Sequence, residues 1–110
     1  MGHPKFEVKT GKDGQFYFNL TAKNGQVILS SEGYTTKSAC NNGIDSVKKN
    51  SQDDSRFERK EAKDSQVFFV LKAGNNQVIG KSEMYKSKQA MENGISSVKE
   101  NAPNAEAEDV

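Results

Sequence analysis

The sequence matches itself without a gap at an offset of 51 residues. Residues 5–50 align with residues 56–101, and 25 of these 46 aligned pairs are identical. The most similar block places residues 42–48, NGIDSVK, over residues 93–99, NGISSVK. Such self-similarity indicates a structural unit that is folded twice. Each unit is too short to bury much of a core alone, so the two copies are expected to fold together.

Each unit begins with three segments that have the pattern of strands. Residues 5–9, KFEVK, alternate apolar and charged side chains. In residues 15–22, QFYFNLTA, every second side chain is apolar, which places these side chains on one face of a strand. A third strand is expected at residues 27–30. Asn24 and Gly25 signal a hairpin turn before it, since both central positions of a type I′ turn require positive φ.

A helix is predicted after the third strand of each unit. Thr36 and Ser87 are suited to cap the two helices, because a hydroxyl oxygen there accepts an otherwise unpaired backbone N–H. Apolar and small residues then share one helical stripe, up to an asparagine 14 positions after each cap. Gly43 and Gly94 lie in mid-helix, where glycine costs about 1 kcal/mol relative to alanine. We therefore expect the helix backbone to lie close against the sheet at these two positions.

The unit is interpreted as strand, strand, strand, helix and a further strand, and the fold class is α+β. We expect residues 1–110 to form one intertwined domain, with a first repeat at 5–54, a second at 55–102 and an acidic tail or short closing strand at 103–110. Pairing the copies covers open strand edges, so we predict one antiparallel sheet with both helices on one face. The duplication is like a homodimer fused into one chain, which predicts a monomer with internal pseudo-twofold symmetry.

The predicted core combines the apolar strand faces with the helical stripes. Its members in the first repeat, each taken together with its counterpart 51 residues later, are Phe6, Phe16, Phe18, Leu20, Val27, Ala39, Ile44 and Val47. Val8 is an exception, because its counterpart is Arg59.

Three segments of the first repeat, residues 19–28, 31–34 and 42–48, resemble the YegP-like family of small prokaryotic proteins, and both copies match it. The resemblance implies one or two copies of the unit in a single sheet, with exchanged C-terminal strands, and dimers for single-copy members. It implies no established enzymatic activity, cofactor or substrate. The second copy departs from the family pattern at three positions, where Val8, Gly25 and Gly33 are replaced by Arg59, Asn76 and Met84.

The composition narrows the classes of function. The chain has a net charge of +1 and contains no apolar stretch of the roughly 18 residues that cross a membrane. No signal-like N-terminus is present, so the expected location is cytoplasmic. Cys40 and His3 are the one cysteine and the one histidine, which leaves no basis for an internal disulfide, a zinc site or histidine-based catalysis. We therefore expect no enzyme, no cofactor, no metal and no membrane partner.

Three further groups of residues have both a structural and a functional interpretation. Cys40 near a helix N-terminus could be a reactive thiolate, but its counterpart is Met91, and a core position is favoured. Glu32 and Glu83 could perform acid–base chemistry, but hydrogen bonding to a turn or a helix N-terminus is favoured. The third group consists of polar residues that recur in both repeats. It could form two equivalent polar sites, although hydrogen bonding between helix and loop is favoured. Its members are Ser31, Asn42, Ser46 and Lys48, with their counterparts Ser82, Asn93, Ser97 and Lys99.

The sheet face that points away from the helices is partly aromatic and flanked by lysines. Residues 1–101 hold 16 basic and 12 acidic residues, a net charge of +4, and residues 102–110 hold the other three acids. Tyr17, Phe68 and Val70 are expected on this face, with Ile28 and Ile79 as neighbours. The candidate interaction face consists of Tyr17, Phe68, Val70, Lys23, Lys72 and Lys81.

Two classes of partner fit such a face. A protein partner could bind the face or an exposed strand edge. Single-stranded nucleic acid is the alternative, with bases stacked on Tyr17 and Phe68 and phosphates at Lys23, Lys72 and Lys81. The protein partner is favoured, because a net charge of +4 is modest for nucleic-acid binding and no RNP-like motif is present. Phosphate contacts weaken steeply with salt, so the salt dependence of binding separates the two hypotheses.

Overall fold

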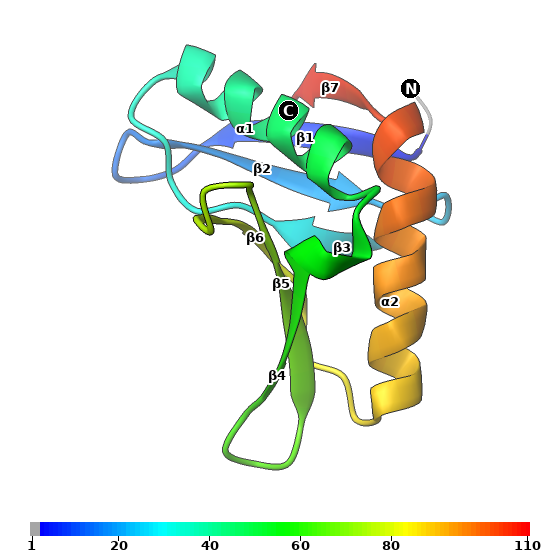
Figure 1. The fold of residues 1–110 in the computed structure, drawn as a ribbon. Coiled ribbons are helices and arrows are strands. Elements are labelled where there is room, and N and C mark those ends of the chain that lie inside the picture. The colour runs from blue at the N-terminus through cyan, green and yellow to red at the C-terminus, as the bar shows by residue number, and fades with distance from the viewer. Residues whose placement is uncertain (1–2) are drawn as a thin grey trace.

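A computed structural model describes residues 3–110 as one curved sheet with two helices (Figure 1). The described helices and strands are, in chain order, β1 Lys5–Thr10, β2 Phe16–Thr21, β3 Val27–Ser30, α1 Lys37–Asn50, β4 Phe57–Glu61, β5 Val67–Lys72, β6 Val78–Lys81, α2 Lys88–Asn101 and β7 Glu106–Asp109. Short 3₁₀ helices at Asp54–Arg56 and Ala102–Asn104 follow α1 and α2. The tandem α+β organisation predicted from the repeat is confirmed.

The seven described strands form one sheet in the order β4-β5-β6-β3-β2-β1-β7. The repeats meet at its centre, where β3 pairs antiparallel with β6 through Ser30 and Lys81. These two residues correspond to each other at the offset of 51, as they must where two equivalent copies meet across a twofold axis. Every other neighbouring pair is antiparallel except β1 and β7, which run parallel.

The sheet is therefore mixed, and the prediction of a fully antiparallel sheet is wrong for its last strand. β7 reaches β1 by way of α2 and the 3₁₀ helix Ala102–Asn104, and a connection that contains a helix permits parallel pairing, which a hairpin does not. Side chains alternate in the same way in both directions, so the sequence pattern carries no information on strand direction. The expected exchange is confirmed in one direction, because the closing strand after the second repeat pairs with the first strand of the first repeat, whereas the first repeat has no separate closing strand.

Both helices cover the concave face of the sheet (Figure 1). α1 contacts β2 of its own repeat and also β5 and β6 of the other repeat, while α2 contacts β5 and β3. One core is therefore shared by the two repeats.

The predicted helix boundaries and caps are confirmed. The Thr36 hydroxyl accepts the backbone N–H of Ala39 at 3.0 Å, and the Ser87 hydroxyl accepts that of Ala90 at 3.1 Å. Each helix has 14 residues and ends at the predicted asparagine. Within residues 3–110, neither helix has the length and apolar character that a membrane crossing requires.

A β-bulge reverses the side-chain alternation in the third strand of each repeat. The register between β2 and β3 shifts so that Thr21 pairs with Val27, and β5 and β6 show the same irregularity. Ile28 and Ile79 consequently join the core, each 7% exposed, while Val27 and Val78 are half-buried. The predictions that Val27 is a core residue and that Ile28 and Ile79 border the opposite face are wrong, because one extra residue exchanges the two faces of a strand.

The other predicted core positions are largely confirmed. The aromatic ring of Phe18 is fully buried and stacks on Tyr34 with 6.2 Å between ring centroids. Phe69 and Tyr85 repeat this arrangement at 6.3 Å. Phe16 is only half-buried at the margin of the core. Buried residues from both repeats include Phe6, Leu20, Ile44 and Val47 with Phe57, Leu71, Ile95 and Val98.

Candidate functional site

The sheet face opposite the helices carries the side chains that alternate with the buried ones. Paired residues of six strands form one row across it: Glu7, Asn19, Ser30, Lys81, Val70 and Glu58. Neighbouring pairs on the same face place Tyr17 beside Lys9 and Phe68 beside Lys60. This is the surface that the sequence predicts as an interaction face.

Three of the predicted residues come together in the second repeat. The ammonium group of Lys81 lies 5.1 Å from the centroid of the half-buried Phe68 ring. Val70 pairs with Lys81 in the sheet and is only 4% exposed. We call Lys60, Phe68, Val70 and Lys81 the second-repeat face. A cation already lies over its aromatic ring, an attraction of about 0.5–1 kcal/mol at an exposed site.

The other predicted lysines are paired with carboxylates of the chain. Lys72 lies 2.6 Å from Glu58, and the hydrogen bond from Lys72 holds the pKa of Glu58 below its ordinary value. Lys23 follows the end of β2 that is remote from Tyr17, and its ammonium lies 3.8 Å from the carboxylate of Glu100 on α2. Neither lysine is placed beside Tyr17.

Tyr17 lies in the first repeat at the position that corresponds to Phe68. Its hydroxyl donates a hydrogen bond to the carboxylate of Asp13 at 2.7 Å, which raises the pKa of Tyr17 and lowers that of Asp13. The negative charge beside the ring disfavours a phosphate group at this point. Tyr17 and Phe68 therefore lie in different halves of the sheet and in different electrostatic surroundings.

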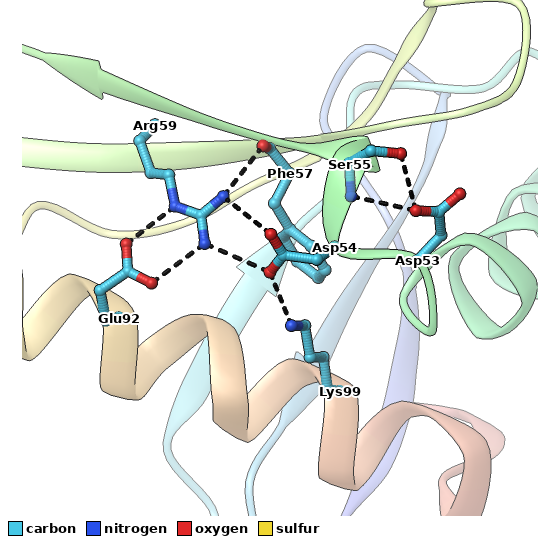
Figure 2. A network of polar contacts seen from close by, with 7 residues as sticks. All are labelled: Asp53, Asp54, Ser55, Phe57, Arg59, Glu92 and Lys99. Atoms are coloured by element: carbon cyan, nitrogen blue, oxygen red, sulfur yellow. Dashed lines mark hydrogen bonds and ion pairs between the residues drawn. The ribbon is translucent and has the colours of Figure 1, made fainter.

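Figure 2 shows a polar network on the helix side of β4 that the sequence analysis did not predict. Arg59 donates from Nε and Nη2 to the two carboxylate oxygens of Glu92 at 2.8 and 3.0 Å. It also donates to Asp54 at 3.3 and 3.5 Å, and Asp54 accepts a further hydrogen bond from Lys99 at 2.6 Å. The network joins β4 to α2 and to the 3₁₀ helix Asp54–Arg56, which precedes β4. Its two cations are balanced by two carboxylates.

The charges in this network reinforce one another. The hydrogen bond from Arg59 lowers the pKa of Glu92, and those from Lys99 and Arg59 lower the pKa of Asp54. The positions that correspond to Arg59, Glu92 and Lys99 in the first repeat are occupied by Val8, Asn41 and Lys48. The network therefore belongs to the second repeat alone, and the exchange of valine for arginine between the repeats was the signal for it in the sequence.

The outer edge of β4 has no partner strand among residues 3–110. Its opposite edge pairs with β5 along the whole strand, from Phe57 with Leu71 to Glu61 with Val67. At the start of this edge, the backbone N–H of Phe57 donates to the Asp54 carbonyl, and the Phe57 carbonyl accepts the Nη1 of Arg59 at 3.5 Å. From Arg59 to Glu61, the outer side of β4 has no partner strand among residues 3–110.

The remaining candidates lie apart from the second-repeat face and from the Arg59 network. Cys40 is fully buried, and burial raises the pKa of its thiol. Glu32 and Glu83 are exposed in loops of different repeats. Within residues 3–110, no three His, Cys, Asp or Glu side chains are grouped closely enough to hold a metal ion.

Of the recurring polar residues, Asn42 and Ser46 border hollows beside α1, whereas Ser31, Ser82 and Lys48 contact the strands. The Ser31 hydroxyl accepts the backbone N–H of Phe18 at 2.9 Å, and the Ser82 hydroxyl accepts that of Phe69 at 2.9 Å. The ammonium of Lys48 lies 5.8 Å from the ring centroid of Phe6. These contacts fit the interpretation that the residues bond loops and helices to the strands.

The chain is similar to a family of domains described as a domain of unknown function, DUF1508. The family model matches twice, over residues 12–58 and 62–109. A UPF0339 protein from Stutzerimonas stutzeri, described as lying in the ptx operon 5′ region, is 51% identical over 105 residues, which cover 96% of this chain and 95% of that protein. The UPF0339 protein YegP of Yersinia pestis is 50% identical over 101 residues, covering 92% of this chain and 88% of that protein.

Two solved structures share the fold. A protein of unknown function from E. coli, yegP, has a solution structure that matches with a TM-score of 0.92 and 43% identity, covering 99% of this chain and 94% of that chain. A UPF0339 protein from Shewanella oneidensis matches with a TM-score of 0.90 and 46% identity, covering 96% of this chain and 89% of that chain. These names state neither a reaction nor a ligand.

Proposed function

This chain belongs to the DUF1508 family, and we propose, on that premise, that it is a non-enzymatic module that binds a protein partner at β4 and the adjoining second-repeat face. The observation that carries the proposal is the unpaired outer edge of β4. An exposed strand edge presents a row of backbone donors and acceptors, and an extended segment of another protein can pair with it.

The side chains of β4 leave this edge accessible. Charged residues on edge strands commonly prevent aggregation, and β4 has charges at four of its five positions. Glu58 is paired with Lys72 across the open face, however, and Arg59 is held by Glu92 on the helix side. These ion pairs draw both side chains over their own sheet and away from the outer edge. The order of charges in β4, negative, positive, positive and negative, still opposes pairing between two copies of β4, because like charges would face each other.

Single-stranded nucleic acid is the second candidate ligand, and the contact of Lys81 with Phe68 favours it. Fewer observations support nucleic acid than support a protein partner. Lys72 is neutralised by Glu58, Asp13 adds a negative charge beside Tyr17, and Val70 is buried. The bases would therefore have one half-exposed ring on which to stack, where single-strand binders use several rings.

Photo-crosslinking in cells that express the chain tests the proposed function. A photoreactive amino acid replaces Lys60 on β4 in one variant and its counterpart Lys9 on β1 in a control variant. We expect protein adducts from position 60 and far fewer from position 9. Adducts that nuclease removes would favour nucleic acid, and an absence of adducts at position 60 would contradict the proposal.

A further inference from the structure

We propose that β4 binds an extended acidic segment of the partner as a parallel strand, in the way that β7 lies on β1. This inference rests on the proposed function and adds the chemistry and direction of the bound segment. The two edges correspond residue by residue at the offset of 51, and only the edge of β1 is occupied.

β7 shows how such an edge binds a strand. It runs parallel to β1, with Lys5 paired to Glu106 and Val8 paired to Asp109. Beyond β7, the backbone N–H of Val110 donates to the carbonyl of Val8 at 2.9 Å. Val8 thus directs its carbonyl outward, and Arg59 is the corresponding residue on β4.

Acidic side chains of β7 contact lysines on both faces of the sheet. On the open face, the Lys5 ammonium lies 2.7 Å from the Glu108 carboxylate. On the helix side, Lys37, the first residue of α1, forms an ion pair with Asp109. Adjacent residues of a strand point to opposite faces, so the neighbouring acids Glu108 and Asp109 satisfy the cations above and below the edge.

The β4 edge repeats one of the two cations of this arrangement. Lys88 is the first residue of α2 and corresponds to Lys37, and it is exposed, without an ion pair to any residue from 3 to 110. Arg56 corresponds to Lys5, but it lies in the 3₁₀ helix before β4, 3.6 Å from Asp53, and borders a hollow beside α1 instead of the outer edge of β4. An acidic side chain in the place of Asp109 would meet Lys88.

Shallow hollows of similar size lie beside both strands. The hollow beside β4, about 270 Å³, is lined by Arg59, Lys60, Glu61, Val67, Lys88 and Met91. The corresponding hollow beside β1, about 230 Å³, is bordered by Asp109 and Val110 at the end of β7. Arg59 is already bonded to Glu92 and Asp54, and Lys60 lies 3.9 Å from Glu58, so Lys88 is the cation in this lining that remains for an acidic occupant.

The course of the chain explains why one edge stays open. After α2, the chain passes through Ala102–Asn104 and has residues left to form β7. After α1, the 3₁₀ helix Asp54–Arg56 leads directly into β4, so the first repeat has no separate closing strand to place on the second. The tandem arrangement thus creates two equivalent edges and one strand to cover them.

The edges differ at Phe57, whose N–H is bonded to the Asp54 carbonyl, and at Arg59, which is compatible with a strand bound from the Phe57 carbonyl onward. Its guanidinium is held toward α2 by Glu92, and its contact with the Phe57 carbonyl is long, at 3.5 Å. An incoming backbone N–H would replace that contact with a hydrogen bond of ordinary length, about 2.9 Å.

A titration of the full-length, ¹⁵N-labelled chain with the peptide NAEAEDV tests this inference by NMR. The peptide copies residues 104–110 and serves as an acidic probe strand. We expect saturable amide shifts confined to Phe57–Glu61, Lys88 and Met91. Lys88→Gln should weaken binding by about two- to fivefold, the range of an exposed ion pair, while Lys12→Gln in the β1–β2 turn should not.

Control peptides separate strand pairing from charge attraction. A peptide N-methylated at alternate backbone positions keeps its charges but loses N–H donors, and NAQAQNV keeps the backbone but loses the acids; we expect both to bind weakly. Equal binding of the N-methylated peptide, shifts in β1 and Lys37 instead of β4, or shifts of β4 with protein concentration alone would overturn the inference. If position 60 still crosslinks to protein in that case, the proposed function stands and only the acidic strand is refuted.

Discussion

Gly43 and Gly94 lie in mid-helix against tyrosine side chains. A Cβ atom would lie 2.4 Å from the Tyr34 hydroxyl oxygen at the first position and 2.3 Å from that of Tyr85 at the second. The close approach predicted from the sequence is confirmed. The group that lies close to the helix backbone is a tyrosine side chain. Tyr34 itself forms a β-bridge with Phe16. The local sequence pattern did not indicate that a tyrosine would occupy this place.

Replacing Gly43 with alanine should lower the free energy of unfolding. Alanine gains about 1 kcal/mol of helix propensity over glycine. A contact as short as 2.4 Å places the cost of overpacking in the upper part of its usual range, at about 2–3 kcal/mol, so we expect a net loss of about 1–2 kcal/mol in urea unfolding. Ser38→Ala, at an exposed position of α1, is the matched control and should change stability little. Unchanged or higher stability of Gly43→Ala would contradict the steric argument.

At the scale of elements, β7 is held by electrostatic contacts as well as by backbone pairing. The pKa of Glu108 is lowered to about 2, with the hydrogen bond from Lys5 as the largest cause. The ordinary value in an unfolded chain is about 4.3. Because the folded pKa is the lower one, the stability that this carboxylate contributes is complete above about pH 4.3 and is lost as the pH falls toward 2.

Acidification should therefore weaken the attachment of β7. Between about pH 5 and pH 2, we expect a lower protection factor for the amide of Val110, which donates to the Val8 carbonyl, relative to the amides of β5. The measurement is hydrogen exchange by NMR, with each rate divided into the intrinsic rate at the same pH. Glu108→Gln should already show low protection at pH 6 and a smaller change on acidification. Protection of Val110 that is equal in both proteins across this range would refute the role of Glu108.

The Arg59 network should make a small, salt-dependent contribution to stability. A double-mutant cycle with Arg59→Met and Glu92→Gln should give a coupling energy of about 0.2–1 kcal/mol in low salt. This coupling should shrink in 1 M salt, where the screening length falls to about 3 Å. The measurement is urea unfolding of the four proteins, and zero coupling in low salt would show that the bidentate contact does not stabilise the attachment of β4 to α2.

At the scale of the whole molecule, neither repeat has a complete core. α1 packs on β5 and β6 of the second repeat, and α2 packs on β3 of the first. Separating the repeats would expose these contacts together with the strand edges at Ser30 and Lys81.

A fragment of residues 1–53 should therefore not fold as a monomer. We expect it to be unfolded at micromolar concentration, or to gain structure only when it self-associates, because a single unit buries too little surface. Circular dichroism over a concentration series, together with sedimentation, distinguishes these states from the full chain. Cooperative unfolding of a monomeric fragment would show that one repeat is sufficient.

The candidate site was predictable only in part. The alternation of residues 66–73 identifies Phe68 and Val70 as facing away from the helices, and the structure places Lys81 beside them. The partners of Lys23 and Lys72 could not be predicted, because Glu100 and Glu58 reach them from other elements. The open edge of β4 could not be predicted either, because a strand edge is open only where no other strand of the fold pairs with it.

The sequence by itself determined the repeat, the order and type of the elements, the helix caps and most of the core, because turn residues, caps and periodicity act within a few positions along the chain. Only the tertiary structure decided the parallel direction of β7, the faces of Ile28 and Ile79, the Arg59 network and the vacancy beside β4. Each of these depends on which strand or side chain lies next to another across a long loop. Two repeats that are nearly equivalent in sequence therefore have different edges in the folded molecule.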